Sequence, residues 1–211
     1  KLLEEAGYFV TYDVLGEDVC NQAGVEQAAQ EYGELLSAIA EEKLECNVSI
    51  KPTHMGLDIA PKFCLETMLS ICTRVTELQG FMRFEMEDSS TTSATLRIFE
   101  ELRATCPEHV GCVLQAMLHR THQDAKDLLG ADKKLNVRLV KGIYVESADI
   151  AYQPYDDINR SYLEILETLL EGGAFVAVAT HDEHLVAGLE TLLDKYPEAR
   201  ERYEIQMLMG V

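Results

Sequence analysis

The sequence predicts an α/β fold in which parallel strands alternate with helices along all 211 residues. Two observations predict it. Short runs rich in β-branched and aromatic residues recur between longer stretches of helical periodicity. Most of these runs are apolar almost throughout, as expected for parallel strands buried on both faces. The candidate strands are residues 8–15, 47–51, 81–85, 111–115, 136–141, 174–180 and 203–209.

The segments between these strands carry helix signals in the same order. Residues 25–42 are apolar at helical intervals, which predicts a helix packed on one face. Residues suited to begin or end later helices are Pro61 and Gly80, Thr121 with Asp124 as a capping-box-like pair, and Asp156 with Gly172. The alternation therefore continues through the chain without a linker or a low-complexity tract.

Seven strands with intervening helices predict an eightfold parallel barrel, which usually needs about 250 residues. Because the sequence stops directly after the seventh strand, we expect one barrel domain over residues 1–211 that lacks its C-terminal eighth unit. The structural alternative is an open doubly wound sheet. The first turn after a strand, VLGEDVCNQAG, lacks the GxGxxG pattern of such nucleotide-binding sheets, which disfavours this alternative.

Charge and cysteine content exclude several classes of function. The chain has 18 Lys and Arg against 37 Asp and Glu, a formal net charge of −19, so it should repel nucleic acid. No apolar run approaches the roughly 20 residues of a transmembrane helix. The six cysteines are scattered through apolar segments and lack zinc spacing, so we expect reduced, mostly buried thiols and no metal site.

Polar residues at the carboxyl ends of barrel strands converge on one mouth, where barrel enzymes place their active sites. The residues at these ends are Asp13, Glu17, Lys51, Glu85, Glu87, Asp88, Gln115, Arg138, Lys141, Tyr144, His181, Asp182, Glu204 and Gln206. On their own they indicate a barrel enzyme with a mixed-charge mouth, able to hold a small zwitterion and an anionic cofactor.

Structural roles compete with functional ones at several of these positions. Lys51 is equally suited to extend its ammonium to solvent or to pair with Glu85 on the next strand. Arg138, inside its strand, needs a carboxylate, an anionic ligand or an aromatic ring nearby, and Glu85 or Glu87 could supply the carboxylate. Gln115 needs either a polar ligand or a hydrogen-bonded core network, because burying an unbonded amide is costly.

The remaining alternatives concern helix starts and packing. Asp88 or Ser89 is suited to cap the helix that follows the third strand, and Asp182 to cap one beginning beside His181. Tyr144 is suited to pack beside Ile143. A last group, expected to fill the interior rather than line a cofactor, consists of Met207, Leu208 and Met209.

Six strings at these strand ends resemble, in order, the successive motifs of the proline dehydrogenase family. They are VSIKPTHMGLDI, FEMEDSSTTSATL, VLQAMLHRT, VRLVKGIYVE, ATHDEHL and EIQMLMGV. The resemblance covers nearly the whole chain. It implies a distorted TIM-like (βα)8 barrel that binds FAD and oxidises L-proline to Δ1-pyrroline-5-carboxylate, passing electrons to a quinone-type acceptor. It also implies a cytoplasmic location in bacteria or a mitochondrial one in eukaryotes. Peripheral contact with a membrane is compatible with this resemblance.

The resemblance implies roles for individual residues. Lys51 is similar to the lysine beside the substrate, and Arg138 to the arginine that bonds flavin N5. The other residues with implied substrate roles are Glu85, Leu139 and Tyr144. Those with implied cofactor roles are Gln115, Lys141, Gly142, Thr180, His181 and Gln206.

Two departures from the family pattern bear on activity. Glu85 stands where the family usually has Asp, and its extra methylene shifts the carboxylate. The family's last helix, with an arginine pair that grips the substrate carboxylate, lies beyond Val211. The alternatives are therefore an inactive flavin-binding remnant, or a related barrel oxidoreductase acting on hydroxyproline or another cyclic amino acid.

Overall fold

The computed structural model describes residues 2–130 and 134–210, which fall into two compact units, residues 1–112 and 113–211. The strand β4 (Val110–Gln115) begins in the first unit and ends in the second. The single barrel domain over residues 1–211 stays a prediction.

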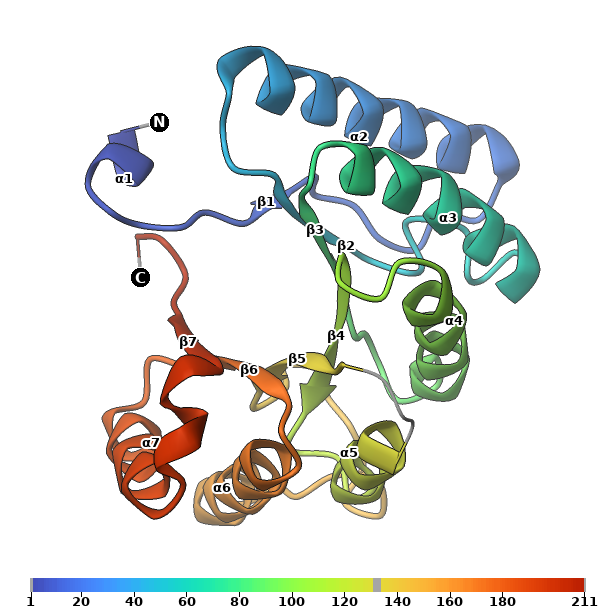
Figure 1. Cartoon of the computed structure of the whole chain (residues 1–211). Helices are drawn as coiled ribbons and strands as arrows, with labels where there is room; N and C mark the ends of the chain where they lie inside the picture. Colours follow the sequence, from blue (N-terminus) through green and yellow to red (C-terminus); the bar gives the residue numbers. More distant parts are fainter. Residues whose placement is uncertain (1, 131–133, 211) are drawn as a thin grey trace. The chain divides into compact units, whose positions relative to one another are not determined.

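The first unit is a parallel βα series. Its strands β1, β2, β3 and the start of β4 pair in chain order, every pair parallel. Figure 1 shows α2 and α3 side by side over this part of the sheet. The elements are α1 (Leu2–Glu5), β1 (Tyr12–Asp13), α2 (Gln22–Glu42), β2 (Asn47–Ile50), α3 (Pro61–Glu77), β3 (Phe81–Phe84) and α4 (Thr92–Thr105).

The second unit continues the alternation. Its strands β5, β6 and β7 pair in parallel, and the amides of Ala116 and Met117, just after β4, donate to the carbonyls of Val140 and Lys141. The helix α6 packs between α5 and α7 (Figure 1). The elements are α5 (Thr121–Gly130), β5 (Asn136–Val140), α6 (Tyr155–Glu171), β6 (Phe175–Ala179), α7 (Glu183–Lys195), the 3-10 helix η1 (Pro197–Glu201) and β7 (Tyr203–Gln206).

These elements confirm the predicted α/β class with seven parallel strands. Five of the strands end within one residue of the predicted position, as β2 does at Ile50 and β3 at Phe84. The two outermost predictions were too long. The run 8–15 forms only the two-residue β1, with Tyr8 and Phe9 exposed, and β7 stops at Gln206. The expected interior packing of the residues after β7 is wrong, because Met207, Leu208 and Met209 are 60%, 72% and 82% exposed.

The helix starts agree only in part with the sequence signals. Pro61 occupies the first turn of α3, and Asp182 caps α7, as predicted. The capping box at Thr121 is wrong, because its hydroxyl donates to the carbonyl of Gln115, 2.6 Å away. Asp156 does not cap α6 either: extended Pro154 precedes the helix, and Asp156 lies in its first turn, where its charge favours the helix dipole.

The core of each unit lies between helices and strands. In the first unit the buried positions of α2 recur every three or four residues, as the predicted periodicity requires: Val25, Ala28, Tyr32, Leu36 and Ile39. Five of the six cysteines are buried, which confirms the expectation of mostly buried thiols, and Cys20 is exposed. Among the described residues, no helix combines the length and apolar character that a membrane span needs.

Candidate functional site

In the first unit, Lys51 directly follows β2, and its ammonium pairs with a carboxylate from the loop after β1. Its Nζ lies 2.5 Å from Oε2 of Glu17, and the two side chains are 29% and 48% exposed. The pair therefore joins the carboxyl ends of two neighbouring parallel strands. The carboxylate partner of Lys51 seen here, Glu17, comes from the loop after β1, whereas the predicted pair was with Glu85.

Glu85 follows β3 and accepts a hydrogen bond from the hydroxyl of Ser49, on β2. The carbonyl of Ser49 accepts from the phenol of Tyr32, 2.6 Å away, which also lies 3.3 Å from Oδ1 of Asp13. Burial, followed by the charge of Asp13, raises the pKa of Tyr32, so the phenol stays a neutral donor. The strand-end carboxylates Asp13 and Glu85 are thus each held by a neighbouring hydroxyl.

Glu87 lies in the loop after β3 and is buried, with 4% of its surface exposed. Its two carboxyl oxygens accept from the backbone amide and the hydroxyl of Thr53, at 2.8 and 2.7 Å. Burial raises the pKa of Glu87, although both bonds from Thr53 oppose that shift. Asp88 has a local role, because its Oδ1 accepts from the amides of Ser90 and Thr91 in the turn before α4. That supports the structural interpretation of Asp88.

In the second unit, a chain of side-chain hydrogen bonds runs between β5 and β7. Arg138 donates through Nε to Oε1 of Gln206 over 2.6 Å, and Nε2 of Gln206 donates to Oε1 of Glu204, also over 2.6 Å. The strand register places Arg138 beside Ala177 and Ala177 beside Glu204. The small side chain of Ala177 leaves room above β6 for this contact between alternate strands.

Lys141 follows β5 and pairs with Asp182, which follows β6. Its Nζ lies 2.5 Å from Oδ2 of Asp182 and 4.0 Å from the centre of the Tyr155 ring. Gly142 comes next, with φ of +108°, and a Cβ added there would lie 2.6 Å from the sulfur of Met117. Only glycine fits this turn without strain.

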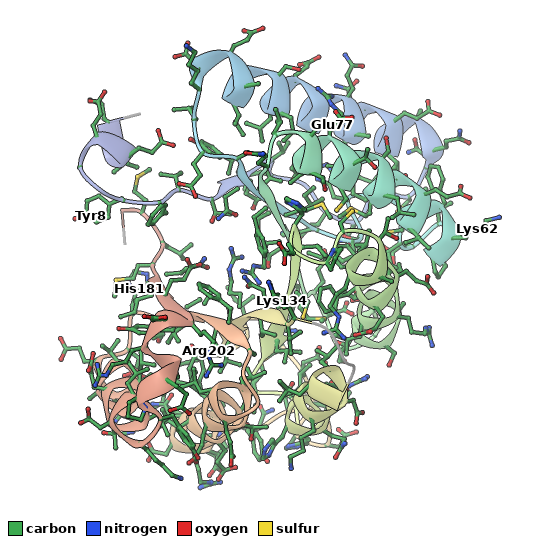
Figure 2. All side chains as sticks on the ribbon, in the orientation of Figure 1. Tyr8, Lys62, Glu77, Lys134, His181 and Arg202 are labelled. Carbon is green, nitrogen blue, oxygen red and sulfur yellow. The ribbon has the colours of Figure 1, made fainter. Side chains whose placement is uncertain are left out.

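Thr180 and His181 follow β6. The hydroxyl of Thr180 accepts from the amide of Asp182 over 3.0 Å, and Thr180 is buried. His181 is exposed, and its Nε2 accepts from the amide of Leu208 over 3.0 Å, which places it against the segment after β7 (Figure 2). Because Nε2 accepts, the neutral ring carries its proton on Nδ1.

Three predicted residues lie among packing side chains. Gln115 ends β4 with 2% of its surface exposed, and Leu139 is fully buried in β5. Tyr144 is half-buried against Met117 and Leu118, not beside Ile143, which is 87% exposed. The roles of Gln115, Leu139 and Tyr144 toward ligands stay predictions.

Sequence reasoning missed the residues that hold these side chains in place. Ser49 and Thr53 hold Glu85 and Glu87, and Tyr155 and Asn159 hold Asp182. One signal was available for the second pair. Tyr155 and Asn159 are four residues apart, so they share one face of a helix, and Asn159 is a buried polar residue.

The donor set of the second unit fits an anionic cofactor. Arg138, Lys141 and the Nδ1–H of His181 are donors that suit phosphate oxygens and the oxygens and nitrogens of an electron-rich ring. In the part of the chain that the structure describes, no three His, Cys, Asp or Glu side chains converge as metal ligands would. The donors of this unit support hydrogen bonding to an anionic organic ligand.

Comparison with known proteins gives one consistent result. The family model for "Proline dehydrogenase" matches residues 1–211. "Proline dehydrogenase 2" of Bacillus subtilis strain 168 is 34% identical over 211 residues, which are all of this chain and 69% of that protein. "Proline dehydrogenase" of Deinococcus radiodurans is 30% identical over 215 residues, with the same coverage.

Solved structures show the same fold. Proline utilization A from Bdellovibrio bacteriovorus matches with a TM-score of 0.88 and 23% identity, and its counterpart from Corynebacterium freiburgense with 0.83 and 24%. Both matches cover all of this chain. The chain spans only 27% and 25% of those two longer chains.

Proposed function

Since this chain belongs to the proline dehydrogenase family of oxidoreductases, we propose that it oxidises L-proline to Δ1-pyrroline-5-carboxylate with FAD as its cofactor. The observation that carries the proposal is the family match over all 211 residues. The position of the polar residues supports it, because they follow parallel strands at the ends where barrel enzymes place their chemistry.

The second unit supplies the residues that we propose hold FAD. Arg138 and Lys141 offer charged donors, and Gly142 lets the backbone turn closely after β5. The other proposed cofactor contacts are Gln115, Thr180, His181 and Gln206. When bound, FAD supplies a two-electron acceptor for a hydride, which we place at its N5 atom.

Arg138 is proposed to donate a hydrogen bond to the flavin near N5. A fixed guanidinium donor favours negative charge that develops nearby during reduction, because it needs no reorganisation at that moment. Gln206 holds the guanidinium through Nε, and Glu204 holds the amide of Gln206. These two residues fix the direction in which Arg138 donates.

Lys51 is proposed to contact the substrate, with Glu85, Tyr144 and Leu139 as further substrate residues. Oxidation removes a hydride from ring carbon and a proton from ring nitrogen, and it leaves a carbon–nitrogen double bond. A neutral amine is the better hydride source, and the ammonium of Lys51 disfavours a second cation close to it. The electrons are proposed to pass onward to a quinone-type acceptor.

The test is a flavin and turnover measurement on the purified protein. Bound FAD should appear in the visible absorption spectrum, and L-proline should reduce a redox dye in its presence. Arg138→Ala should change the flavin spectrum or weaken FAD binding. Bound flavin without proline-dependent reduction would select a non-catalytic flavin protein, and faster reduction with hydroxyproline would select the other cyclic substrate. A protein that binds no FAD would contradict the proposal.

A further inference from the structure

The carboxylate of Asp182 has two separate tasks. Its Oδ1 accepts from the amide of His184 over 2.9 Å and so caps α7. Its Oδ2 accepts from three donors: Nζ of Lys141 at 2.5 Å, Nδ2 of Asn159 at 3.0 Å, and the phenol of Tyr155. A helix cap needs only one of the two oxygens. The second oxygen therefore serves something other than α7.

These contacts fix the ammonium of Lys141 from two sides. Oδ2 of Asp182 lies on one side, and the ring of Tyr155 lies 4.0 Å from Nζ. Tyr155 and Asn159 come from the first two turns of α6, so three segments meet here: the end of β5, the start of α6 and the turn after β6. The side chains of Lys141 and Asp182 are 25% and 12% exposed.

The charge of Asp182 is secured by the same contacts. Burial acts to raise its pKa, but the hydrogen bonds from Lys141, Tyr155 and Asn159 hold the pKa well below its usual range. The carboxylate is therefore ionised whenever the protein is folded at neutral pH. Its ion pair with Lys141 has no net charge, so Lys141 acts as a directed hydrogen-bond donor rather than as a long-range attractive charge.

We propose that Asp182 is a positioning residue that fixes the Lys141 ammonium at the carboxyl end of β5, ready to bind the cofactor. The inference rests on the proposed function, in which Lys141 contacts FAD. A free lysine side chain has many rotamers, and ordering it on binding weakens affinity. Because Asp182 orders Lys141 already in the folded protein, the rotamer entropy of the lysine is lost on folding and not on cofactor binding.

The first test is Asp182→Asn, which separates the two tasks. Asparagine caps helices as well as aspartate does, so its Oδ1 keeps the bond to His184. Its amide nitrogen then faces the donors of Lys141, Tyr155 and Asn159, and it cannot accept from them. The dissociation constant for FAD, measured by flavin fluorescence quenching, should rise about tenfold, in the range of coupling within one ion-pair network.

A double-mutant cycle shows whether Asp182 acts through Lys141. In a Lys141→Met background, Asp182→Asn should change the dissociation constant for FAD by less than about twofold, because the ammonium that it positions is gone. An equal loss in both backgrounds would overturn the inference. The matched control is Asp157→Asn, which removes one charge from the first turn of α6 and its surface pair with Arg160. It should leave the dissociation constant unchanged.

The positioning can also be measured without cofactor. Acetic anhydride labelling followed by peptide mass spectrometry should show Lys141 protected in the wild type and several-fold more reactive in Asp182→Asn. Tyr155→Leu is a second variant at an exposed residue, and it removes the ring and hydroxyl without touching the cap. It should expose Lys141 in the same way.

A failure of the positioning role and a failure of the proposed function give different experimental results. Unchanged labelling of Lys141 in both Asp182→Asn and Tyr155→Leu would overturn the positioning role itself. A wild-type protein with protected Lys141 that binds no FAD would overturn the proposed function, and with it the cofactor step of this inference.

Discussion

Arg138 on β5 and Gln206 on β7 contact each other across β6, with Nε of the arginine 2.6 Å from Oε1 of the glutamine. The amide of Gln206 has its oxygen toward Arg138 and its nitrogen toward Glu204. This order matches the chemistry of the two neighbours, since the guanidinium can only donate and the carboxylate can only accept. Gln206 is thus the link between a cation and an anion.

Gln206→Leu should remove both bonds and leave the half-buried Nε of Arg138 without this acceptor. We expect the free energy of unfolding to fall by about 1 kcal/mol, the net contribution of a typical hydrogen bond. Urea denaturation followed by circular dichroism measures it. Gln27→Leu removes an exposed Gln–Glu bond on α2 and should leave stability nearly unchanged. Equal effects of both variants would contradict the linking role of Gln206.

Lys51→Ala should lower proline-dependent turnover about a hundredfold, the usual loss when one charged contact in an active site is removed. FAD binding should be unchanged, because Lys51 is proposed to contact the substrate. The measurement is dye reduction at saturating and limiting L-proline. Lys62, near the start of α3 (Figure 2), pairs only loosely with Glu66 at 3.7 Å and serves as the control through Lys62→Ala. Wild-type kinetics in Lys51→Ala would exclude the substrate role.

Glu87→Gln should change how stability depends on pH. Burial raises the folded-state pKa of Glu87, so the folded protein binds more protons than the unfolded chain, and Glu87 costs stability as pH rises from the usual carboxyl range toward neutrality. Glutamine does not ionise, so the variant does not lose this stability as pH rises. Its stability relative to wild type, from urea denaturation at several pH values, should therefore increase between about pH 4 and pH 7. A difference that is constant with pH would show that the pKa of Glu87 is not raised.

Gly142→Ala should destabilise the second unit. The positive φ at this residue disfavours any side chain, and the added Cβ would meet the Met117 sulfur at 2.6 Å. We expect a loss of about 1–3 kcal/mol in the free energy of unfolding. Gly130→Ala is the matched control, because a Cβ there has nothing within 4 Å and should be tolerated. Thermal unfolding of both variants compares them directly, and equal midpoints would refute the strain.

The sequence predicted the strands well because buried parallel strands are apolar on both faces. Each strand therefore appears in the sequence as one short and nearly continuous apolar run. It located the polar residues for the same reason: Lys51, Arg138 and His181 stand where that pattern breaks or ends. The partners of these residues were not predictable. The pair of Lys51 with Glu17 depends on the path of the loop after β1, which no local pattern determines. The prediction that Asp156 caps α6 was also wrong. The residue before the helix is Pro154, in extended conformation, and Asp156 lies inside the first turn.

The thiols provide a practical consequence. Burial raises the pKa of Cys64 and Cys112 to about 12 and also raises that of Cys46, so these buried sulfurs react slowly with alkylating reagents. Cys20 is the exposed thiol among the six, and it lies in the same loop as Glu17. A maleimide dye or spin label added to the unmodified protein should therefore attach at one natural position. That label would report whether the surroundings of this loop change when a ligand binds, without any engineered cysteine.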